Sequence, residues 1–175
     1  QELGKFKRNI NVIPNNMEKY MSFSVGNVST YYDMKKGKEV QRENFNLRFI
    51  DSFQFMPSNL AQLVCDLKNG GLSMFSHTCK EFGIHAAKMM TRKGIYPYVY
   101  MSSWDKFDVS PKIMEDFTND LTGEKIKEKD FQFFKEVCLT FDIKTLGEYH
   151  DLYLKSDVLL LADVFENFRR VCRKY

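Results

Sequence analysis

A tyrosine and an aspartate stand four residues apart in the stretch YHDLYLKSDVLLLADVF (149–165). In a helix, Tyr149, Tyr153 and Asp157 line one stripe beside an apolar face. A carboxylate at the edge of a core is costly unless a metal, a cation or hydrogen-bond donors compensate it. Two interpretations of Asp157 stay open. It is a functional acid, or it simply pairs with a lysine or faces water. Spacing alone favours the second interpretation. The predicted apolar face consists of Val158, Leu161, Ala162, Phe165 and Phe168.

Two strands are predicted ahead of this helix. The stretch YMSFSVGNVSTYY (20–32) alternates loosely and runs into a turn at KKGKE (35–39). The stretch FNLRFIDSFQF (45–55) places Phe45, Leu47, Phe49 and Asp51 on one face with period two. A strand is therefore expected to lead directly into the next helix.

The helices are predicted from caps and periodicity. MPSNLAQLVCDLKNGG (56–71) indicates a helix with Ser58 as its cap. SPKIMEDFTNDL (110–121) and EKDFQFFKEVCLTFD (128–142) indicate two more. Thr145, three residues ahead of Glu148, has the capping-box spacing that opens a long final helix. Residues 71–104 show no lasting period, which predicts a long irregular connection with one extended piece.

Composition favours one compact domain. The chain has 175 residues, 43% of them apolar, and a net charge of +3 from 26 basic and 23 acidic residues. This charge is compatible with a nucleic-acid partner but does not require one. No window is apolar enough to span a membrane and no signal peptide is evident, so we expect no membrane partner and an intracellular, soluble protein.

The cysteines show no metal or disulfide pattern. Cys65, Cys79, Cys138 and Cys172 are scattered without a C-x-x-C pair and are interpreted as free thiols. His77, Cys79 and His85 form the densest group of potential ligands. A structural zinc site needs four ligands, and the fourth is missing from this spacing.

Three ordered stretches carry a family resemblance. LRFIDSFQFMPSNLAQLVCDL (47–67), RKGIYPY (92–98) and LGEYHDLYLKSDVLLLADVFENFR (146–169) resemble the family B DNA polymerases of the protein-primed, viral, organellar and mobile-element type. The resemblance runs from about Lys19 to the end of the chain and falls in the 3'-5' proofreading exonuclease domain. YLKSD matches the family's third exonuclease motif, Tyr-x-x-x-Asp. It implies that Asp157 binds a divalent metal and that Tyr153 orients the attacking water.

Two further motifs match by resemblance. SFQFM (52–56) is similar to the family's single-stranded-DNA motif, with Ser52, Phe53 and Met56 at its defined positions and Phe in place of the usual Leu. An aromatic ring can stack on a base and a hydroxyl can bond a phosphate, although Phe53 could equally be a core residue. KGIY (93–96) is similar to the Lys-x-x-hydrophobic element, which implies that Lys93 supports catalysis at the scissile phosphate.

The resemblance implies two-metal phosphodiester hydrolysis with Mg2+ or Mn2+. Such a site needs several carboxylates, yet the chain contains no Asp-x-Glu motif. NLRFID (46–51) does not supply the Asn-x-x-Phe-Asp motif, because Ile50 separates Phe49 from Asp51. This one-residue shift moves the acid to the strand face opposite to the one that the motif requires. The polymerase palm motifs are also missing, so we expect this segment not to polymerise by itself.

The implied fold is α/β: a partial RNase H-like exonuclease fold, with a mixed sheet flanked by helices and a long C-terminal helix that carries Tyr153 and Asp157. The chain is expected to be the C-terminal portion of an exonuclease domain within a longer DNA-directed DNA polymerase, a nucleotidyltransferase of DNA replication. The implied partners are a single-stranded DNA 3' end or primer-template, the remainder of the polymerase chain and a terminal priming protein.

The expected location is the nucleus or the site of viral, organellar or mobile-element replication.

Two alternatives to the exonuclease function stay open. One is a catalytically dead remnant that binds single-stranded nucleic acid or a protein. The other is a plain structural domain without affinity for single strands.

Overall fold

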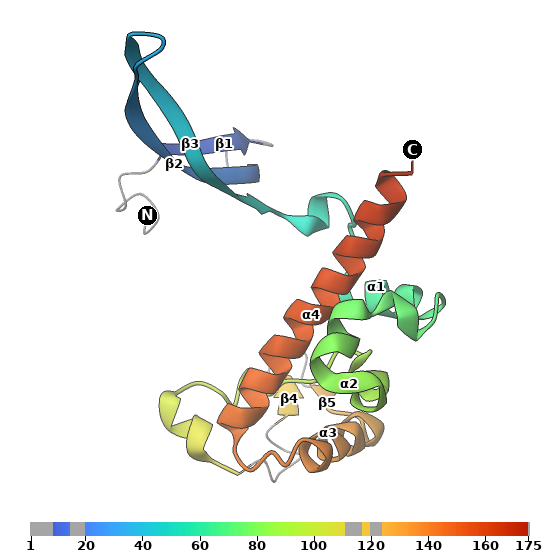
Figure 1. Ribbon diagram of the computed structural model, residues 1–175. Helices are drawn as coiled ribbons and strands as arrows, with labels where there is room; N and C mark the ends of the chain where they lie inside the picture. The colour runs from blue at the N-terminus through green and yellow to red at the C-terminus, as the bar shows by residue number, and fades with distance from the viewer. Residues whose placement is uncertain (1–8, 15–19, 111–116, 120–123, 175) are drawn as a thin grey trace. The chain divides into compact units, whose positions relative to one another are not determined.

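The computed structural model describes residues 9–14, 20–110, 117–119 and 124–174. The chain divides into two compact units, Gln1–Pro57 and Ser58–Tyr175. Strands form the first unit and helices dominate the second (Figure 1). The expectation that the whole chain forms one domain stays a prediction. Within the described ranges, no helix combines the length and the apolar composition needed to cross a membrane.

The first unit is an antiparallel sheet of three strands in the order β1-β2-β3. The strands are β1 (Asn9–Pro14), β2 (Tyr20–Asp33) and β3 (Lys38–Ile50). Phe23 and Phe49 are directly opposed in the register and their rings stack at a centroid distance of 4.5 Å. Such cross-strand aromatic pairs stabilise a sheet and hold its register.

The turn between β2 and β3 forms where the sequence predicts it. The Asp33 carboxylate accepts hydrogen bonds from the backbone N–H groups of Lys35 and Lys36, at 2.9 and 3.3 Å. Gly37 has a φ of 60°, which a residue without Cβ adopts at little cost. The predicted bounds of the second strand are wrong, because β3 begins at Lys38 and ends at Ile50.

The transition from strand to helix is not direct. Ser52–Gln54 form a 3₁₀ helix, η2, in which the Asp51 carboxylate caps the N–H of Phe53 at 3.0 Å. Helix α1 (Leu60–Lys68) then begins with Asn59 as its cap, bonded to the N–H of Gln62 at 2.9 Å. The predicted cap, Ser58, is therefore wrong by one residue.

Helix α2 (Ser76–Met90) occupies much of the region predicted to be irregular, after the short 3₁₀ helix η3 (Leu72–Met74). Gly83 interrupts this helix with a φ of 74° and a ψ of 159°. The interruption divides the apolar pattern into two short pieces, neither long enough to reveal a helical period. A further 3₁₀ helix, η4 (Trp104–Asp108), follows.

The remaining elements are the strands β4 (Thr118–Asn119) and β5 (Glu124–Lys125), α3 (Glu128–Thr140) and α4 (Leu146–Cys172). The predicted helices at α3 and α4 are confirmed. The capping box of α4 is present in full, with Thr145 and Glu148 each bonding the other's backbone N–H. The helix predicted over 110–121 lies largely outside the described residues, and within its described part Thr118–Asn119 form the strand β4 instead.

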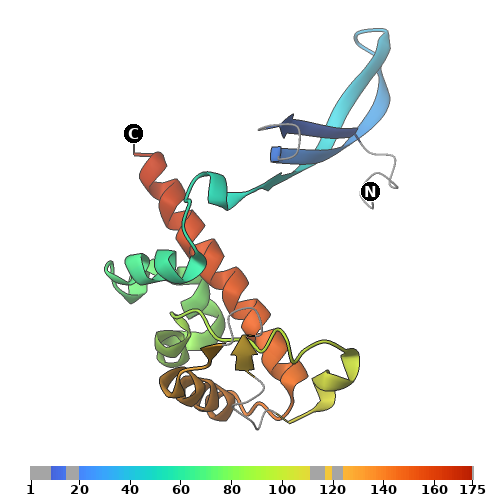
Figure 2. The same ribbon diagram turned by 180° about the vertical axis from the view of Figure 1, so that it is seen from behind.

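Helix α4 is the central element of the second unit. Helices α1 and α2 pack along it, and η4 lies beside its N-terminal end, on the other side from α2 and α3 (Figures 1 and 2). The predicted apolar face of α4 is wrong in part, since Val158 is 58% exposed and Leu161 is 39% exposed, while its other three residues are half-buried. The helix instead buries the face that carries its two tyrosines, which continues through the buried residues Ser156, Leu160, Asp163 and Val164.

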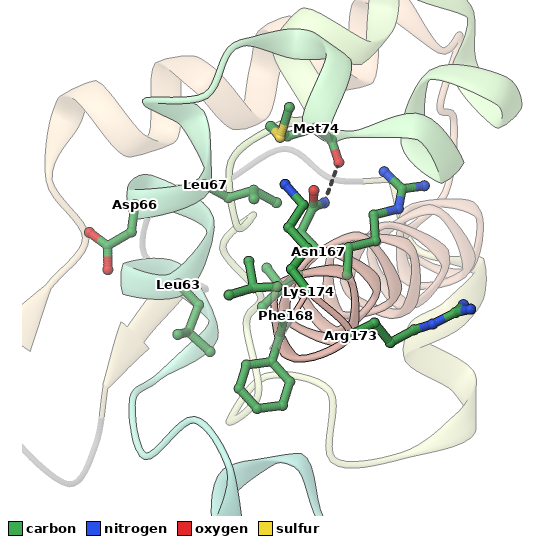
Figure 3. A pocket seen from close by; sticks show the side chains of 11 residues that line it. Leu63, Asp66, Leu67, Met74, Asn167, Phe168, Arg173 and Lys174 are labelled. Atoms are coloured by element: carbon green, nitrogen blue, oxygen red, sulfur yellow. Dashed lines mark hydrogen bonds between the residues drawn. The ribbon is translucent and has the colours of Figure 1, made fainter.

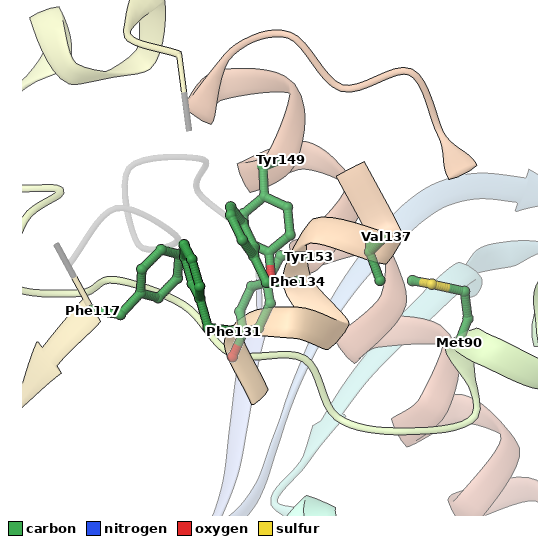
Figure 4. Close-up of a cluster of buried hydrophobic side chains, with 7 residues drawn as sticks. All are labelled: Met90, Phe117, Phe131, Phe134, Val137, Tyr149 and Tyr153. Atoms are coloured by element: carbon green, nitrogen blue, oxygen red, sulfur yellow. The ribbon is translucent and has the colours of Figure 1, made fainter. Parts of the chain in front are cut away.

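An aromatic core joins α3 to α4 (Figure 4). The Phe134 ring lies 4.7 Å from that of Phe117 and 4.6 Å from that of Tyr149, both in edge-to-face geometry. Full burial of a large apolar side chain stabilises a fold by about 1.5–3 kcal/mol. Because Tyr149 and Tyr153 both belong to this cluster, the core determines where α4 presents Asp157.

A buried aspartate ties α4 to the start of α2. The side chain of Asp163 is fully buried and accepts from the backbone N–H groups of His77 and Thr78, at 2.8 and 3.0 Å. The Thr78 hydroxyl donates to it at 2.7 Å, and His77 Nδ1 lies 2.8 Å away. Asp163 therefore caps α2 from another helix.

The expected combination of strands and helices is confirmed in its coarse form. The described strands are all antiparallel, and they form a small sheet in the first unit and a two-stranded ribbon in the second. The RNase H-like arrangement stays a prediction.

Candidate functional site

The ammonium group of Lys93 donates to Asp157 Oδ2 at 3.1 Å. Their side chains are 34% and 21% exposed, so the pair lies at the boundary between core and solvent. The open interpretation that Asp157 pairs with a lysine is thus the arrangement observed, and the lysine is the residue singled out at the KGIY stretch. The structure brings Lys93, Tyr153 and Asp157 together.

Gly94 allows this approach. A Cβ at this position would lie 3.2 Å from Tyr153 Cδ2 and 3.5 Å from the Tyr149 hydroxyl oxygen, the first of which is a tight contact. The Tyr149 hydroxyl also donates to the carbonyl of Ile95. Residues 93–95 therefore lie flat against α4, and the lysine reaches the carboxylate because the next residue has no side chain.

Asp157 has one oxygen that Lys93 does not satisfy. Oδ1 is buried and has no hydrogen-bond partner in the part of the chain that the structure describes, and neither does the hydroxyl of Ser156. A buried acceptor without a partner costs about 1–3 kcal/mol, and more when it is charged. Such an oxygen fits a ligand of a hard divalent cation such as Mg2+ or Mn2+.

Asp157 could supply one such ligand. In the described ranges no group of three or more His, Cys, Asp or Glu side chains is arranged to hold a metal ion. His77, the first residue of the densest potential ligand group, contacts the buried Asp163 instead.

Tyr153 presents its hydroxyl at the same place. Its oxygen lies 2.9 Å from the hydroxyl oxygen of Tyr98, and its ring centroid lies 5.8 Å from the ammonium of Lys93. Burial, followed by the hydrogen bond with Tyr98 and the charge of Asp157, raises the pKa of the Tyr153 hydroxyl above its ordinary value of 10.0. This hydroxyl stays protonated at neutral pH, so it can orient a water or a phosphate but cannot act as a base.

Tyr98 is a site residue that the motif matches did not reveal. Its side chain is 67% exposed and contacts the ring of Tyr96 at 5.0 Å. The Tyr96 hydroxyl in turn lies 2.6 Å from His150 Nδ1 on α4. The only local signal for Tyr98 was the concentration of tyrosines in YPYVY (96–100), a stretch that is not a strand: Tyr98 to Tyr100 form a turn.

A groove of about 350 Å³ opens beside these residues. Its wall includes Lys93, Tyr96, Tyr98, Lys127 and Tyr153. Asp130 also lines it, but its carboxylate is paired with the guanidinium of Arg92. The groove is within the size range of small-molecule sites and combines aromatic walls with lysines.

Ser52, Phe53 and Met56 belong to the first unit. Ser52 and Phe53 lie in η2, and Met56 follows it. The Phe53 side chain is 58% exposed, so the open interpretation of Phe53 as a core residue is wrong. Ser52 and Met56 are half-buried.

A separate groove of about 790 Å³ lies between α1 and the end of α4 (Figure 3). Asn167 Nδ2 donates to the Met74 carbonyl there at 2.8 Å. Leucines 63 and 67 and Phe168 form its apolar wall, with Arg173 and Lys174 at its edge. It contains none of the catalytic, metal-binding or DNA-binding residues implied by the resemblance.

Comparison with known protein families, with curated proteins and with solved structures found no match. A functional proposal therefore rests on two observations: the geometry of Lys93, Tyr153 and Asp157, and the sequence resemblance.

Proposed function

We propose that this chain contributes one side of a 3'-5' proofreading exonuclease site in a family B DNA polymerase with an RNase H-like exonuclease domain. One observation carries the proposal. Lys93 and Asp157, singled out in two different motifs 64 residues apart, are hydrogen-bonded to each other. Tyr153, from the second motif, lines a groove of lysines and tyrosines together with Lys93.

The proposed substrate is the single-stranded 3' end of a primer. Its terminal nucleotide would enter the groove, where the exposed ring of Tyr98 offers a face for base stacking. Ser52, Phe53 and Met56, in the first unit, are proposed to bind single-stranded DNA by the chemistry that their side chains share with the family motif. A strand that leaves a duplex loses base stacking, which such aromatic contacts compensate.

Each site residue has a distinct role in the proposed reaction. Asp157 would hold a divalent cation through its buried Oδ1. The protonated Tyr153 hydroxyl would orient the attacking water by hydrogen bonding. The ammonium of Lys93 would stabilise charge that develops on the scissile phosphate. When bound, Mg2+ or Mn2+ supplies activation of water and stabilisation of the leaving oxygen.

The remaining acidic ligands of the proposed site would come from other parts of the polymerase. The pairing of Asp157 with Lys93 has a use in this scheme, because it keeps a lone carboxylate neutralised while the cation is away. The same pairing supports a second candidate function. In a remnant that binds single strands without hydrolysing them, no metal would be needed, and Lys93 would permanently neutralise Asp157.

A binding experiment separates these candidates. A 5'-fluorescent single-stranded oligonucleotide is titrated with the protein, with and without Mn2+, and checked for shortening. Asp157→Asn is compared with Asp151→Asn, which changes an exposed acid on the same helix. The exonuclease proposal expects Mn2+ to tighten binding several-fold for wild type and Asp151→Asn, but not for Asp157→Asn.

Oligonucleotide shortening that Asp157→Asn abolishes would add direct support for hydrolysis. Binding that is tight but indifferent to Mn2+ and to Asp157→Asn would favour the remnant. Absence of any strand binding by the folded protein would overturn both.

A further inference from the structure

Trp104, the single tryptophan of the chain, is 86% exposed at the start of η4. Its indole stacks on the Phe107 ring at a centroid distance of 5.3 Å and an interplanar angle of 26°. At this exposure, the indole face turned away from Phe107 is open to solvent. A large aromatic side chain displayed in this way is a frequent anchor of binding surfaces.

A series of ring contacts leads from Tyr153 to Trp104. The rings of Tyr98 and Tyr153 are 6.4 Å apart, and those of Tyr96 and Tyr98 are 5.0 Å apart. The series continues from Tyr96 to His150 at 5.5 Å, from His150 to Phe107 at 5.0 Å and from Phe107 to Trp104. Tyr98 and Trp104 are its strongly exposed members, while the three rings between them are half-buried.

The position of η4 is held by packing on α4. Gly147 lies against Phe107, and a Cβ at that glycine would come within 3.0 Å of the Phe107 carbonyl oxygen. Leu146 donates its N–H to the carbonyl of Val109 at 2.8 Å. The exposed indole is thus presented by a segment that is bonded to the same helix as the candidate site.

We propose that Trp104 is a second base-stacking position for a single strand whose 3' end occupies the groove at Tyr98. This inference rests on the proposed function and adds the path of the strand away from the site. Aromatic rings bind single strands by stacking on successive bases, with little preference for sequence.

The charges around Trp104 favour a contact of its ring with bases over a contact with phosphates. Asp105 and Asp108 are exposed within η4, and the nearby Lys106 lies over the Tyr100 ring at 4.7 Å. This segment therefore has no surplus of positive charge. The contribution of Trp104 to affinity should change little with salt, whereas contacts of lysines to phosphates weaken as salt rises.

The unique tryptophan is its own probe. Intrinsic fluorescence is recorded while the protein is titrated with a single-stranded oligonucleotide of about 12 nucleotides, within the range of known single-strand sites, and with a dinucleotide. The proposal expects quenching by the longer strand and none by the dinucleotide, which occupies the groove alone. Total binding is followed in parallel by anisotropy of labelled strands.

Variants complete the test. Trp104→Ala should weaken binding of the longer strand about tenfold, and Trp104→Phe should retain part of that affinity. Leu139→Ala removes another exposed side chain, which is 81% exposed on α3, and should have no effect. Because Trp104 is so exposed, its truncation leaves the core intact.

Two outcomes overturn the inference in distinguishable ways. If the longer strand binds but neither quenches Trp104 nor loses affinity in Trp104→Ala, the stacking role is wrong and the proposed function stands. If no strand binds the folded wild type, both fail, and the exposed indole then serves a partner of another class, such as a protein.

Discussion

Lys93 and Asp157 are hydrogen-bonded at 3.1 Å although 64 residues separate them in the chain. The pair connects the segment that follows α2 to the middle of α4. It leaves Asp157 Oδ1 buried without a hydrogen-bond partner in the described residues. The two carboxylate oxygens therefore differ, because Oδ2 accepts from the lysine while Oδ1 has no partner in the described residues.

A double-mutant cycle should measure the pair. Lys93→Met leaves a half-buried carboxylate without its cation, and we expect it to lower the free energy of unfolding by about 1–2 kcal/mol. Asp157→Asn should cost less, because it removes the charge on the unsatisfied oxygen. The coupling energy from chemical denaturation should be about 1 kcal/mol. Additive effects, with no coupling, would contradict the observed pairing.

Gly94→Ala should disturb the site through sterics alone. The new methyl group would press on the Tyr153 ring at 3.2 Å and displace residues 93–95. We expect a loss of about 1 kcal/mol in stability and a several-fold loss in single-strand affinity, measured by denaturation and anisotropy. Ser102→Ala, at an exposed position further along the same connection, is the control. Unchanged binding by Gly94→Ala would show that the segment does not need this close approach.

The buried tyrosines should make stability fall at high pH. Burial is the first cause that raises the pKa values of Tyr149 and Tyr153 above 10.0. As pH rises past about 10, the unfolded chain loses these protons while the folded protein keeps them. The stability contributed is therefore full below pH 10 and is lost as pH rises through the folded-state pKa values.

Absorbance of tyrosinate gives the readout for this prediction. Tyr149 and Tyr153 should ionise only when the protein unfolds. Tyr153→Phe should remove one of these two delayed ionisations. Ionisation of all tyrosines near pH 10 in the folded protein would contradict the burial of these hydroxyls.

Asp163→Ala should be severely destabilising. The substitution leaves the backbone N–H groups of His77 and Thr78 without their acceptor in a buried place. We expect a loss of about 3 kcal/mol or more, visible as a lower denaturation midpoint with exposure of α2. Asp151→Ala, on the exposed face of α4, should have little effect. A loss below about 0.5 kcal/mol for Asp163→Ala would contradict the capping role.

Local signals in the sequence predicted α3, α4 and the β2–β3 turn well. The capping box at Thr145 and Glu148 predicted the start of the longest helix because cap chemistry depends on neighbours in the chain. The buried face of α4 was not predictable in this way. In DVLLLADVF nearly every face is apolar, so packing against α1 and α2 decides which residues are buried.

Helix α2 was missed for a different reason. Gly83 adopts a positive φ inside it, and the cap of its first turn comes from Asp163 on α4. Neither feature is visible to a window moving along the sequence. The Lys93–Asp157 pair is similar, because each residue alone has a plain interpretation and only tertiary packing brings the two together.

The most direct test of the proposed site is the position of a bound 3' end. A single-stranded oligonucleotide with a photoreactive 3'-terminal thymine analogue is crosslinked to the protein, and the modified residues are identified by mass spectrometry. A strand end in the groove predicts crosslinks at Tyr96, Tyr98 or Tyr153 that Lys93→Met and Gly94→Ala reduce. Crosslinks confined to the groove between α1 and the end of α4, or unaffected by these variants, would contradict the proposed site.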